Sequence, residues 1–410
     1  MQPSSRSRSL AFLASIAVLL SSFVFAVDGI AQSPTTRPRV QLGDVFYLGK
    51  FTLPFDDGAG GALTYSHPVM GMGADGSSLY VGCSSGIARV AIPALGATAA
   101  ILEPCRRVPD ISAVDPGDSN GYNYGGILSW LGKLVVSAYV FYDADVDAAM
   151  SHWSGTSIGG VLGPYSVGTL NAGFVAGPMT PIPAEWRALL GGPVLTGQCC
   201  LSIISRTSSG PSASVFDPAQ LGATNPVPST MLVGYPINHT NSAIGSYAVS
   251  GPLYDLASSF GGMAFPEGTR SLLFVERVGT IANRCYGTGT NNPSLHNTPI
   301  PNGGGHVYCY DPTNPYQGGH SFPYKNVIGA YDANDLLAVK QGSKQPWDVI
   351  PYAVWEINQM DNTGSATMNS SAYDPVTKRW YIRQQTDGRT PEVHVYEIRT
   401  GGSGGDSTPP

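Results

Sequence analysis

The sequence predicts an all-β fold, and three features of its composition support this. Glycine and proline are abundant, with 51 Gly and 33 Pro in 410 residues, well above the ordinary share of about 12% for the pair. The strong helix formers Glu and Lys occur only seven and six times, whereas Asp, which is typical of turns, occurs 21 times. Hydrophobic residues make up 42% but charged residues only 12%, which excludes both a disordered chain and a coiled coil.

Residues 1–31 have the three parts of a secretory signal peptide. Arg6 and Arg8 precede an apolar run at 10–24, and small residues follow it. The run is shorter than the roughly 20 residues of a membrane span, so we expect cleavage and no membrane span afterwards, with an uncleaved anchor as the alternative. The chain should then be secreted, periplasmic or at the cell surface. Its remaining 20 basic and 27 acidic residues form no basic stripe, which argues against a nucleic-acid partner.

Six cysteines in an exported chain favour disulfides. The economical pairing from their spacing is Cys83 with Cys105, Cys285 with Cys309, and a vicinal bond between Cys199 and Cys200. A zinc set of Cys285, His296, His306 and Cys309 is the alternative for one pair, but two cysteines of an exported protein more often bond each other. We therefore predict no metal and no cofactor.

A recurring hairpin unit organises the chain: a glycine-containing apolar strand, a tight polar turn and a second β-rich strand. The five copies begin at Gly71, Gly125, Cys199, Gly261 and Ser371. Such repeats predict a β-propeller with five blades, or six if residues 315–359 hold a degenerate blade. Glycine at the head of the first strand fits this fold, because innermost strands crowd around a central axis.

Strands outside the hairpins and two short helices complete the expected architecture. Further strands are expected at 88–92, 307–310, 353–357 and 393–398, on the outer side of each unit. An early strand at 45–53 should pair with the one at 393–398 and close the ring, which removes an exposed sheet edge. Helices are expected at 183–190 and 332–340. Residues 32–400 are thus assigned to a single domain, and residues 401–410 to a flexible Gly/Ser/Pro tail.

One hairpin resembles a known family. The run from Tyr373 to Ile382, Tyr-Asp-Pro-Val-Thr-Lys-Arg-Trp-Tyr-Ile, is similar to the inner hairpins of many secreted β-propellers. The resemblance covers the five hairpins, about a third of the chain that remains after signal cleavage. It implies a fold and names no activity.

Three sequence motifs match known signatures but lack the required context. Residues 71–76 have the spacing of a dinucleotide-binding loop, and residues 82–86 have that of a nucleophile elbow around Ser84, yet a strand rather than a helix is expected after each. The run 117–119, Gly-Asp-Ser, resembles an esterase motif without a nearby histidine. None of the three is taken as a site.

A calcium loop is the weaker interpretation of a run of aspartates. Asp143, Asp145 and Asp147 have the spacing of calcium ligands, but Ala148 and Ser154 stand where the turn glycine and the bidentate glutamate should be. A surface turn explains the run better.

Ligands of a propeller usually bind where the inner strands open the central channel. The repeat alignment and a recurring arginine at the ends of second strands place a set of candidate ligand-binding residues near that opening: His67, Tyr122, Tyr124, Gln198, Cys199, Cys200, Arg206, Arg277, Asn369 and Arg383. Tyrosines and a vicinal disulfide offer flat surfaces to a sugar ring, and arginines bind carboxylates. The simpler interpretation is that these side chains satisfy backbone groups at strand ends.

The expected function is binding of a carbohydrate or similar small ligand at the channel mouth. A glycoside hydrolase or polysaccharide lyase on the same fold is one alternative, and a structural or adhesion module of the cell surface is another. Hydrolysis usually needs two carboxylates roughly 5 to 9.5 Å apart. The candidate catalytic residues are Glu276, Glu356, Asp118, His67 and His152. Because glutamate is so scarce, binding is favoured over catalysis; the sequence specifies no oligomeric state.

Overall fold

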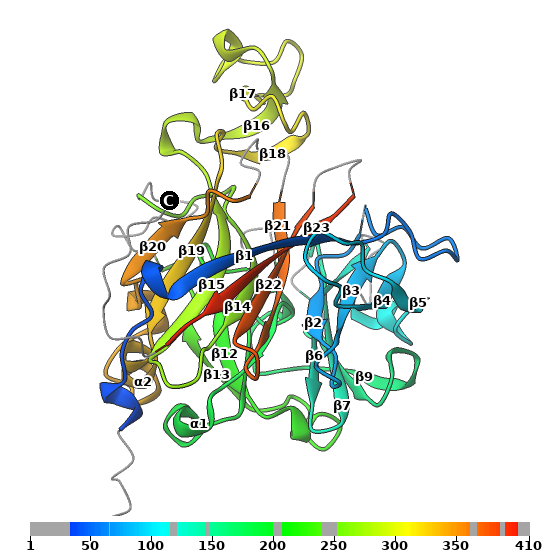
Figure 1. Ribbon diagram of the computed structural model, residues 1–410. Coiled ribbons are helices and arrows are strands. Elements are labelled where there is room, and N and C mark those ends of the chain that lie inside the picture. Colours follow the sequence, from blue (N-terminus) through cyan, green and yellow to red (C-terminus); the bar gives the residue numbers. More distant parts are fainter. Residues whose placement is uncertain are drawn as a thin grey trace, which may run out of the picture. The chain divides into compact units, whose positions relative to one another are not determined.

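The strands described by the structure fall into five antiparallel sheets of four strands and one smaller sheet of three. This computed structural model describes residues 33–64, 66–114, 121–143, 147–199, 207–239, 252–360, 367–385 and 390–400. Within this part of the chain no helix is long and apolar enough to cross a membrane. The prediction of an all-β fold is confirmed (Figure 1).

Each four-stranded sheet is a meander whose strands pair in order. The first contains β2 (Met70–Met72), β3 (Ser78–Cys83), β4 (Gly86–Ala91) and β5 (Ile101–Arg106). The second contains β6 (Tyr122–Trp130), β7 (Lys133–Val140), β8 (His152–Gly155) and β9 (Val161–Tyr165). The third contains β10 (Met179–Pro181), β11 (Val194–Thr196), β12 (Ala213–Phe216) and β13 (Ser229–Val233). The fourth contains β14 (Ser259–Ala264), β15 (Ser271–Val278), β19 (Lys325–Asp332) and β20 (Ala353–Glu356).

The fifth sheet joins the two ends of the described chain. Its strands are β21 (Thr367–Asp374), β22 (Arg379–Gln385), β23 (Glu392–Ile398) and, on the outside, β1 (Val45–Thr52). β1 pairs antiparallel with β23, with Val45 opposite Ile398. The predicted pairing of the first and last strands is therefore confirmed. It covers the outer edge of β23, which would otherwise present unpaired backbone groups.

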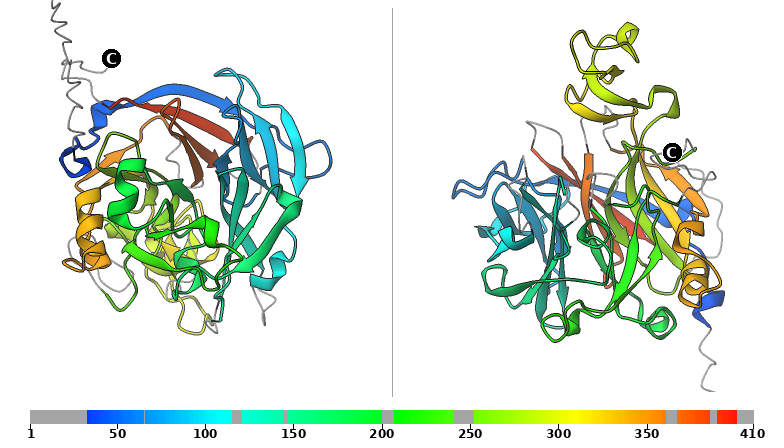
Figure 2. Two further views of the ribbon diagram at one scale, coloured as in Figure 1. Left: turned by 90° about the horizontal axis from the view of Figure 1, so that it is seen from below. Right: turned by 180° about the vertical axis from the view of Figure 1, so that it is seen from behind.

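The first strands of the five sheets lie against one another. β2 contacts β6 and β21, β6 contacts β10, β10 contacts β14, and β14 contacts β21; the sheets surround this group of strands (Figure 2, left). Glycine is required for such close approach. A Cβ added at Gly71 would lie 2.2 Å from the carbonyl oxygen of Ile127, and one at Gly126 would lie 2.1 Å from that of Gly177. The prediction that crowding selects glycine in these strands is confirmed.

Five separate hydrophobic cores lie between consecutive sheets. One core joins sheets one and two, and the next three join each following pair. The last core joins sheet five to sheet one and contains Phe51 and Tyr381 from the former and Leu79 and Val90 from the latter. Trp153, Trp186 and Trp380 are fully buried in three of these cores. Each sheet is thus covered on both faces by its neighbours.

Two expectations about the strands were wrong. Most of the run that begins at Cys199 lies outside the described residues, but the first strand of the third sheet is β10, and Ala213–Phe216, expected as a second strand, is the third. β10 has only three residues and ends in Pro181, so it lacks the alternating pattern by which strands are found. The strand expected at 307–310 lies in the three-stranded sheet and not at the outer side of a four-stranded one.

The residues between β15 and β19 form that small sheet, in the order β17 (Tyr308–Tyr310), β16 (Cys285–Thr290) and β18 (Gln317–His320). Residues 315–359, considered as a degenerate sixth blade, instead supply β18 to this sheet and β19 and β20 to the fourth sheet.

Both expected helices are present. α1 (Ala184–Leu190) ends at Gly191, which has the left-handed φ of 86° typical of a helix C-terminus. α2 (Ala333–Lys340) begins after Asp332, whose carboxylate accepts a hydrogen bond from the backbone NH of Asn334. Short 3-10 helices occupy Pro34–Thr36, Leu42–Asp44, Ile111–Val114, Ile158–Gly160, Ala172–Phe174, Pro218–Gln220, Ile281–Asn283, Pro293–Leu295 and Pro346–Asp348.

The disulfides Cys83–Cys105 and Cys285–Cys309 are formed as predicted, with Cα atoms 6.2 and 5.6 Å apart. They fit a chain that folds in an oxidising compartment. The predicted signal peptide and C-terminal tail lie outside the described residues.

Candidate functional site

The structure brings together three predicted ligand-binding residues at the amino ends of the first strands of sheets one and two. The His67 ring stacks on Tyr122 at 6.1 Å and meets Tyr124 edge-on at 4.8 Å. Its Nδ1 lies 3.2 Å from Oδ1 of Asn123. Burial lowers the pKa of His67, and the bond to Asn123 opposes this effect in part. Three residues that were each expected near the channel opening are therefore in contact with one another.

Cys199 and Gln198 adjoin this cluster, but both are buried. The Sγ of Cys199 lies 3.6 Å from the carbonyl oxygen of Pro68, and the residue is disulfide-bonded. Cys200 lies outside the described residues, so the vicinal bond remains a prediction. The Gln198 amide donates to the carbonyl oxygens of Ser208 and Gly210 and accepts from the NH of Ser208. This side chain holds the segment that follows residue 206.

The predicted arginines make separate contacts. Arg383 is fully buried and donates to the carbonyl oxygens of Gly82 and Leu63, so it ties sheet five to sheet one. Burial lowers its pKa to about 9. The guanidinium of Arg277 lies 4.4 Å from the ring centre of Tyr324. Arg206 lies outside the described residues, as does the side chain of Asn369, whose backbone belongs to β21.

The two predicted catalytic glutamates lie in the fourth sheet. Glu276 of β15 and Glu356 of β20 both pair with Val327 of β19, the strand between them. Glu276 is fully buried, and its two carboxyl oxygens lie 2.9 and 3.0 Å from the Tyr254 hydroxyl. Burial raises the pKa of Glu276 to about 8, against a smaller opposing effect of the Tyr254 bond. Glu356 lies on the outer strand, where it forms a 2.7 Å ion pair with Lys325. One carboxyl is thus inside a core and the other at a sheet edge.

His152 lies within β8 and is fully buried. Its Nδ1 lies 2.8 Å from the Ser151 hydroxyl and its Nε2 lies 3.3 Å from the Thr196 hydroxyl. Burial lowers the pKa of His152 to about 3, so the ring is neutral. Asp118, the remaining catalytic candidate, lies outside the described residues.

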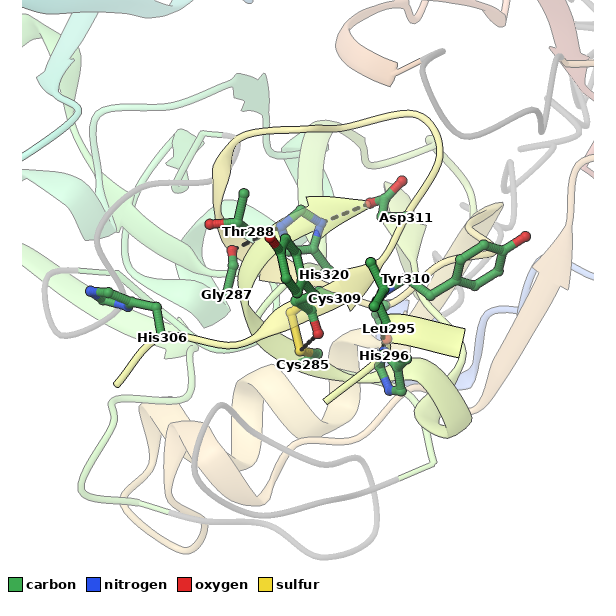
Figure 3. Close-up of a disulfide and its surroundings, with 12 residues drawn as sticks. Cys285, Gly287, Thr288, Leu295, His296, His306, Cys309, Tyr310, Asp311 and His320 are labelled. Atoms are coloured by element: carbon green, nitrogen blue, oxygen red, sulfur yellow. Dashed lines mark hydrogen bonds and ion pairs between the residues drawn. A yellow bond between two sulfur atoms is a disulfide. The ribbon is translucent and has the colours of Figure 1, made fainter. Parts of the chain in front are cut away.

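The residues considered for metals have other partners. Cys285 and Cys309 are bonded to each other, while His296 accepts a hydrogen bond from the NH of Tyr310 and His306 points away from the disulfide (Figure 3). Asp143 is buried and accepts bonds from the Asp147 NH and the Asn171 amide, and Asp145 lies outside the described residues. No group of three or more His, Cys, Asp or Glu among the described residues is arranged to hold a metal ion.

A pocket of about 330 Å³ lies at the carboxyl ends of the five first strands. All five four-stranded sheets contribute to it; its lining includes Met70–Ala74, Ile127–Trp130, Met179–Pro183, Phe265 with Glu267, and Ser371–Val376. The volume lies within the range of small-molecule sites, roughly 300 to 1,000 Å³. Arg187 of α1 completes the wall.

The pocket combines aromatic walls with a few polar groups. Trp130, Phe265 and Tyr373 supply aromatic surface. The Thr180 hydroxyl and the Trp130 indole NH are buried, and neither has a hydrogen-bond partner among the described residues. Such groups cost free energy unless a ligand or water bonds them. The Arg187 guanidinium lies 5.3 Å from the Trp130 ring centre.

Two carboxylate side chains, Glu267 and Asp374, also line this pocket. Burial, and then the charges of Glu267 and Asp374, raise the pKa of the Tyr373 hydroxyl, which is therefore a neutral donor at ordinary pH. Asp374 is engaged in the hairpin turn, where it accepts bonds from the Val376 NH at 3.0 Å and the Thr377 hydroxyl at 2.5 Å. Glu267 is exposed.

The pocket was not predicted from the sequence, because the candidate ligand-binding residues were placed at the amino ends of the first strands. The Tyr373 hairpin and the Gly71–Gly76 turn were recognised only as markers of the fold. Their position after each first strand was the available signal, since equivalent turns of a repeat gather at one end of the assembly.

No protein-family model and no curated protein sequence matches the chain. Among solved structures, it is similar to one described as showing that the GH130 family of mannoside phosphorylases contains glycoside hydrolases that target β-1,2 mannosidic linkages in Candida mannan (8% identity, TM-score 0.42, covering 90% of this chain and 92% of that one). It is also similar to a Parabacteroides distasonis protein provisionally described as a glycoside hydrolase (8% identity, TM-score 0.40, covering 90% of this chain and 98% of that one). A third similar structure is a glycosyl hydrolase from Bacteroides ovatus (9% identity, TM-score 0.37, covering 89% of this chain and 94% of that one). Likenesses this weak assign no activity to this protein.

Proposed function

We propose that residues 32–400 form a closed five-bladed β-propeller of an exported protein, which binds a carbohydrate or similar small ligand in the pocket at the carboxyl ends of its inner strands. Five cores between five consecutive sheets, the last core joining sheet five to sheet one, support a closed ring. In such a ring the deepest concave surface lies on the axis, where ligands usually bind.

The observation that carries the proposal is a pocket of about 330 Å³ whose wall combines aromatic side chains with polar ones. A hydroxyl-rich ligand that stacks on Trp130 or Tyr373 can also bond the polar groups of this wall. Sugars offer both a ring face and hydroxyl groups. Arg187, Glu267 and the Tyr373 hydroxyl would orient such a ligand.

Binding explains this pocket better than glycoside hydrolysis. A hydrolase usually needs two carboxyl groups free to act on one bond, and Asp374 is already committed to its turn. Glu276, the carboxyl whose pKa is raised to about 8, is hydrogen-bonded within a core and does not line the pocket. The remaining pocket carboxylate, Glu267, would act alone.

Calorimetric titration of the purified protein with neutral and acidic mono- and disaccharides tests the proposal. Trp130→Ala should weaken binding at least about tenfold, because it removes both the stacking face and the NH. Tyr373→Phe should weaken it about three- to tenfold through loss of one hydroxyl. Tyr396→Phe is the matched control, since its buried hydroxyl has no partner among the described residues and lies outside the pocket; it should bind as the wild type does.

Two results would overturn the proposal. One is the absence of binding to any sugar of the panel. The other is binding that His67→Ala abolishes and the pocket variants leave unchanged, which would move the site to the other end of the inner strands.

A further inference from the structure

The small sheet β17-β16-β18 is a separate structural element inserted between β15 and β19. It extends away from the four-stranded sheets (Figure 1; Figure 2, right). No described residue of 285–320 lines the pocket proposed as the ligand site. Any binding function of this inserted sheet is therefore separate from the pocket.

The inserted sheet is braced from within. The Cys285–Cys309 disulfide joins β16 to β17. His320 and Asp311 are fully buried, and Nδ1 of the histidine lies 3.0 Å from the carboxylate (Figure 3). Nε2 of His320 faces the carbonyl oxygens of Gly287 and Tyr316 at 3.2 and 3.0 Å. These contacts link His320 of β18 to Gly287 of β16 and to Asp311, the residue after β17.

The exposed surface of this sheet carries no charged side chain. Residues 285–320 contain no Lys, Arg or Glu, and their single acidic residue, Asp311, is buried against His320. The same 36 residues include four tyrosines, five asparagines and seven glycines. Exposed groups on this element are therefore hydroxyls, amides, imidazoles and aromatic rings.

One face of the sheet aligns several of these groups. Thr288 lies between Tyr308 on one neighbouring strand and Gln317 on the other, and opposite residues project from the same face. The Thr288 hydroxyl bonds the Gln317 side chain at 2.8 Å, and Gln317 also reaches His306 at 3.1 Å. Tyr286, two residues before Thr288, is 53% exposed. Tyr316, the residue before β18, is 77% exposed.

We propose that this surface binds a neutral polysaccharide, with Tyr286 and Tyr316 as stacking residues and Thr288 and Gln317 as hydrogen-bonding residues. Stacking of tyrosine on sugar rings together with bonds from hydroxyls and amides needs no charge. An anionic polymer or a nucleic acid would require basic side chains, which this element lacks.

A protein partner fits the surface less well. Protein interfaces are enriched in Met and Arg as well as in aromatic residues, and residues 285–320 contain no Met and no Arg. A rigid uncharged platform suits a repetitive polymer of sugars, which offers the same ring faces along its length.

Affinity electrophoresis in gels containing hydroxyethylcellulose, galactomannan, dextran or polygalacturonate tests this second site. Wild-type protein should be retarded by at least one of the three neutral polymers, and about 0.5 M NaCl should not change the retardation, because no ion pair is involved. The double variant Tyr286→Ala/Tyr316→Ala should lose at least about tenfold in affinity. Tyr142→Ala is the matched control, because Tyr142 is 52% exposed and lies on another element; it should behave as the wild type does.

Gln317→Ala, which leaves both tyrosines in place, should weaken binding by a smaller factor, and the pocket variant Trp130→Ala should leave it intact. The proposal is overturned if no neutral polymer retards the wild type, or if only polygalacturonate does so and salt abolishes the effect. It is also overturned if Tyr142→Ala reduces binding as much as the double variant, or if the two tyrosines are needed only for capture of a protein.

Discussion

Replacement of Glu276 by glutamine should remove a pH-dependent loss of stability. Glu276 is fully buried, and burial raises the pKa of its carboxyl from 4.5 to about 8. Between these values the folded protein holds the proton and the unfolded chain does not, so the unfolding free energy of the wild type falls as pH rises, by about 1.4 kcal/mol per pH unit. The full cost approaches the order of 5 kcal/mol near pH 8. Glutamine keeps the side-chain shape, bonds Tyr254 and does not ionise.

Urea unfolding of both proteins from about pH 5 to about pH 7.5 measures this difference. The stability of Glu276→Gln relative to the wild type should rise steadily with pH, whatever fixed cost the substitution carries. Glu267→Gln, at an exposed glutamate, should show a flat difference over the same range. A flat difference for Glu276→Gln as well would refute the reasoning, because it would mean that Glu276 ionises at the same pH in both states.

Two further predictions concern packing and the inserted sheet. Gly126→Ala would place a Cβ 2.1 Å from the Gly177 carbonyl oxygen and should lower the unfolding free energy by about 2 kcal/mol or more. Gly318→Ala is the control: nothing lies within 4 Å of its Cβ, so it should lower the unfolding free energy by less than about 1 kcal/mol. Equal urea midpoints for the two variants would contradict this prediction. Cys285→Ser/Cys309→Ser removes a disulfide between residues 24 apart in sequence and should lower the stability of the inserted sheet by about 3 kcal/mol. Amide hydrogen exchange in 285–320 should then be faster than in the wild type. Unchanged exchange there would show that the His320–Asp311 pair is enough to stabilise the sheet.

Local features of the fold were predictable because their causes are local. The glycine, proline and aspartate pattern of the hairpins sets turn geometry within a few residues. The helix start at Asp332 and the helix end at Gly191 likewise depend on neighbouring residues. Two disulfides followed from the short separations between their cysteines. Alignment of equivalent positions of the repeat placed His67, Tyr122 and Tyr124 near one opening, and the structure shows them in contact.

Other features depend on partners distant in sequence. β10 is a strand because β11 pairs with it, since its three residues carry no strand pattern of their own. Arg277 and Arg383 were grouped by their place in the repeat, yet their surroundings differ: a tyrosine ring for Arg277 and two backbone carbonyls for Arg383. The position in a repeat determines where the backbone of a residue lies, whereas the neighbouring sheet determines which groups its side chain contacts.

By itself the sequence determined an all-β chain of glycine-rich hairpins, with its first strand paired to its last and few carboxylates available for catalysis. Only the tertiary structure determined at which end of the inner strands the pocket lies. It also determined that residues 285–320 form a separate three-stranded sheet. The physical reason is that turns and strand alternation are set by neighbouring residues, whereas a pocket lined by five sheets exists only after all five have packed.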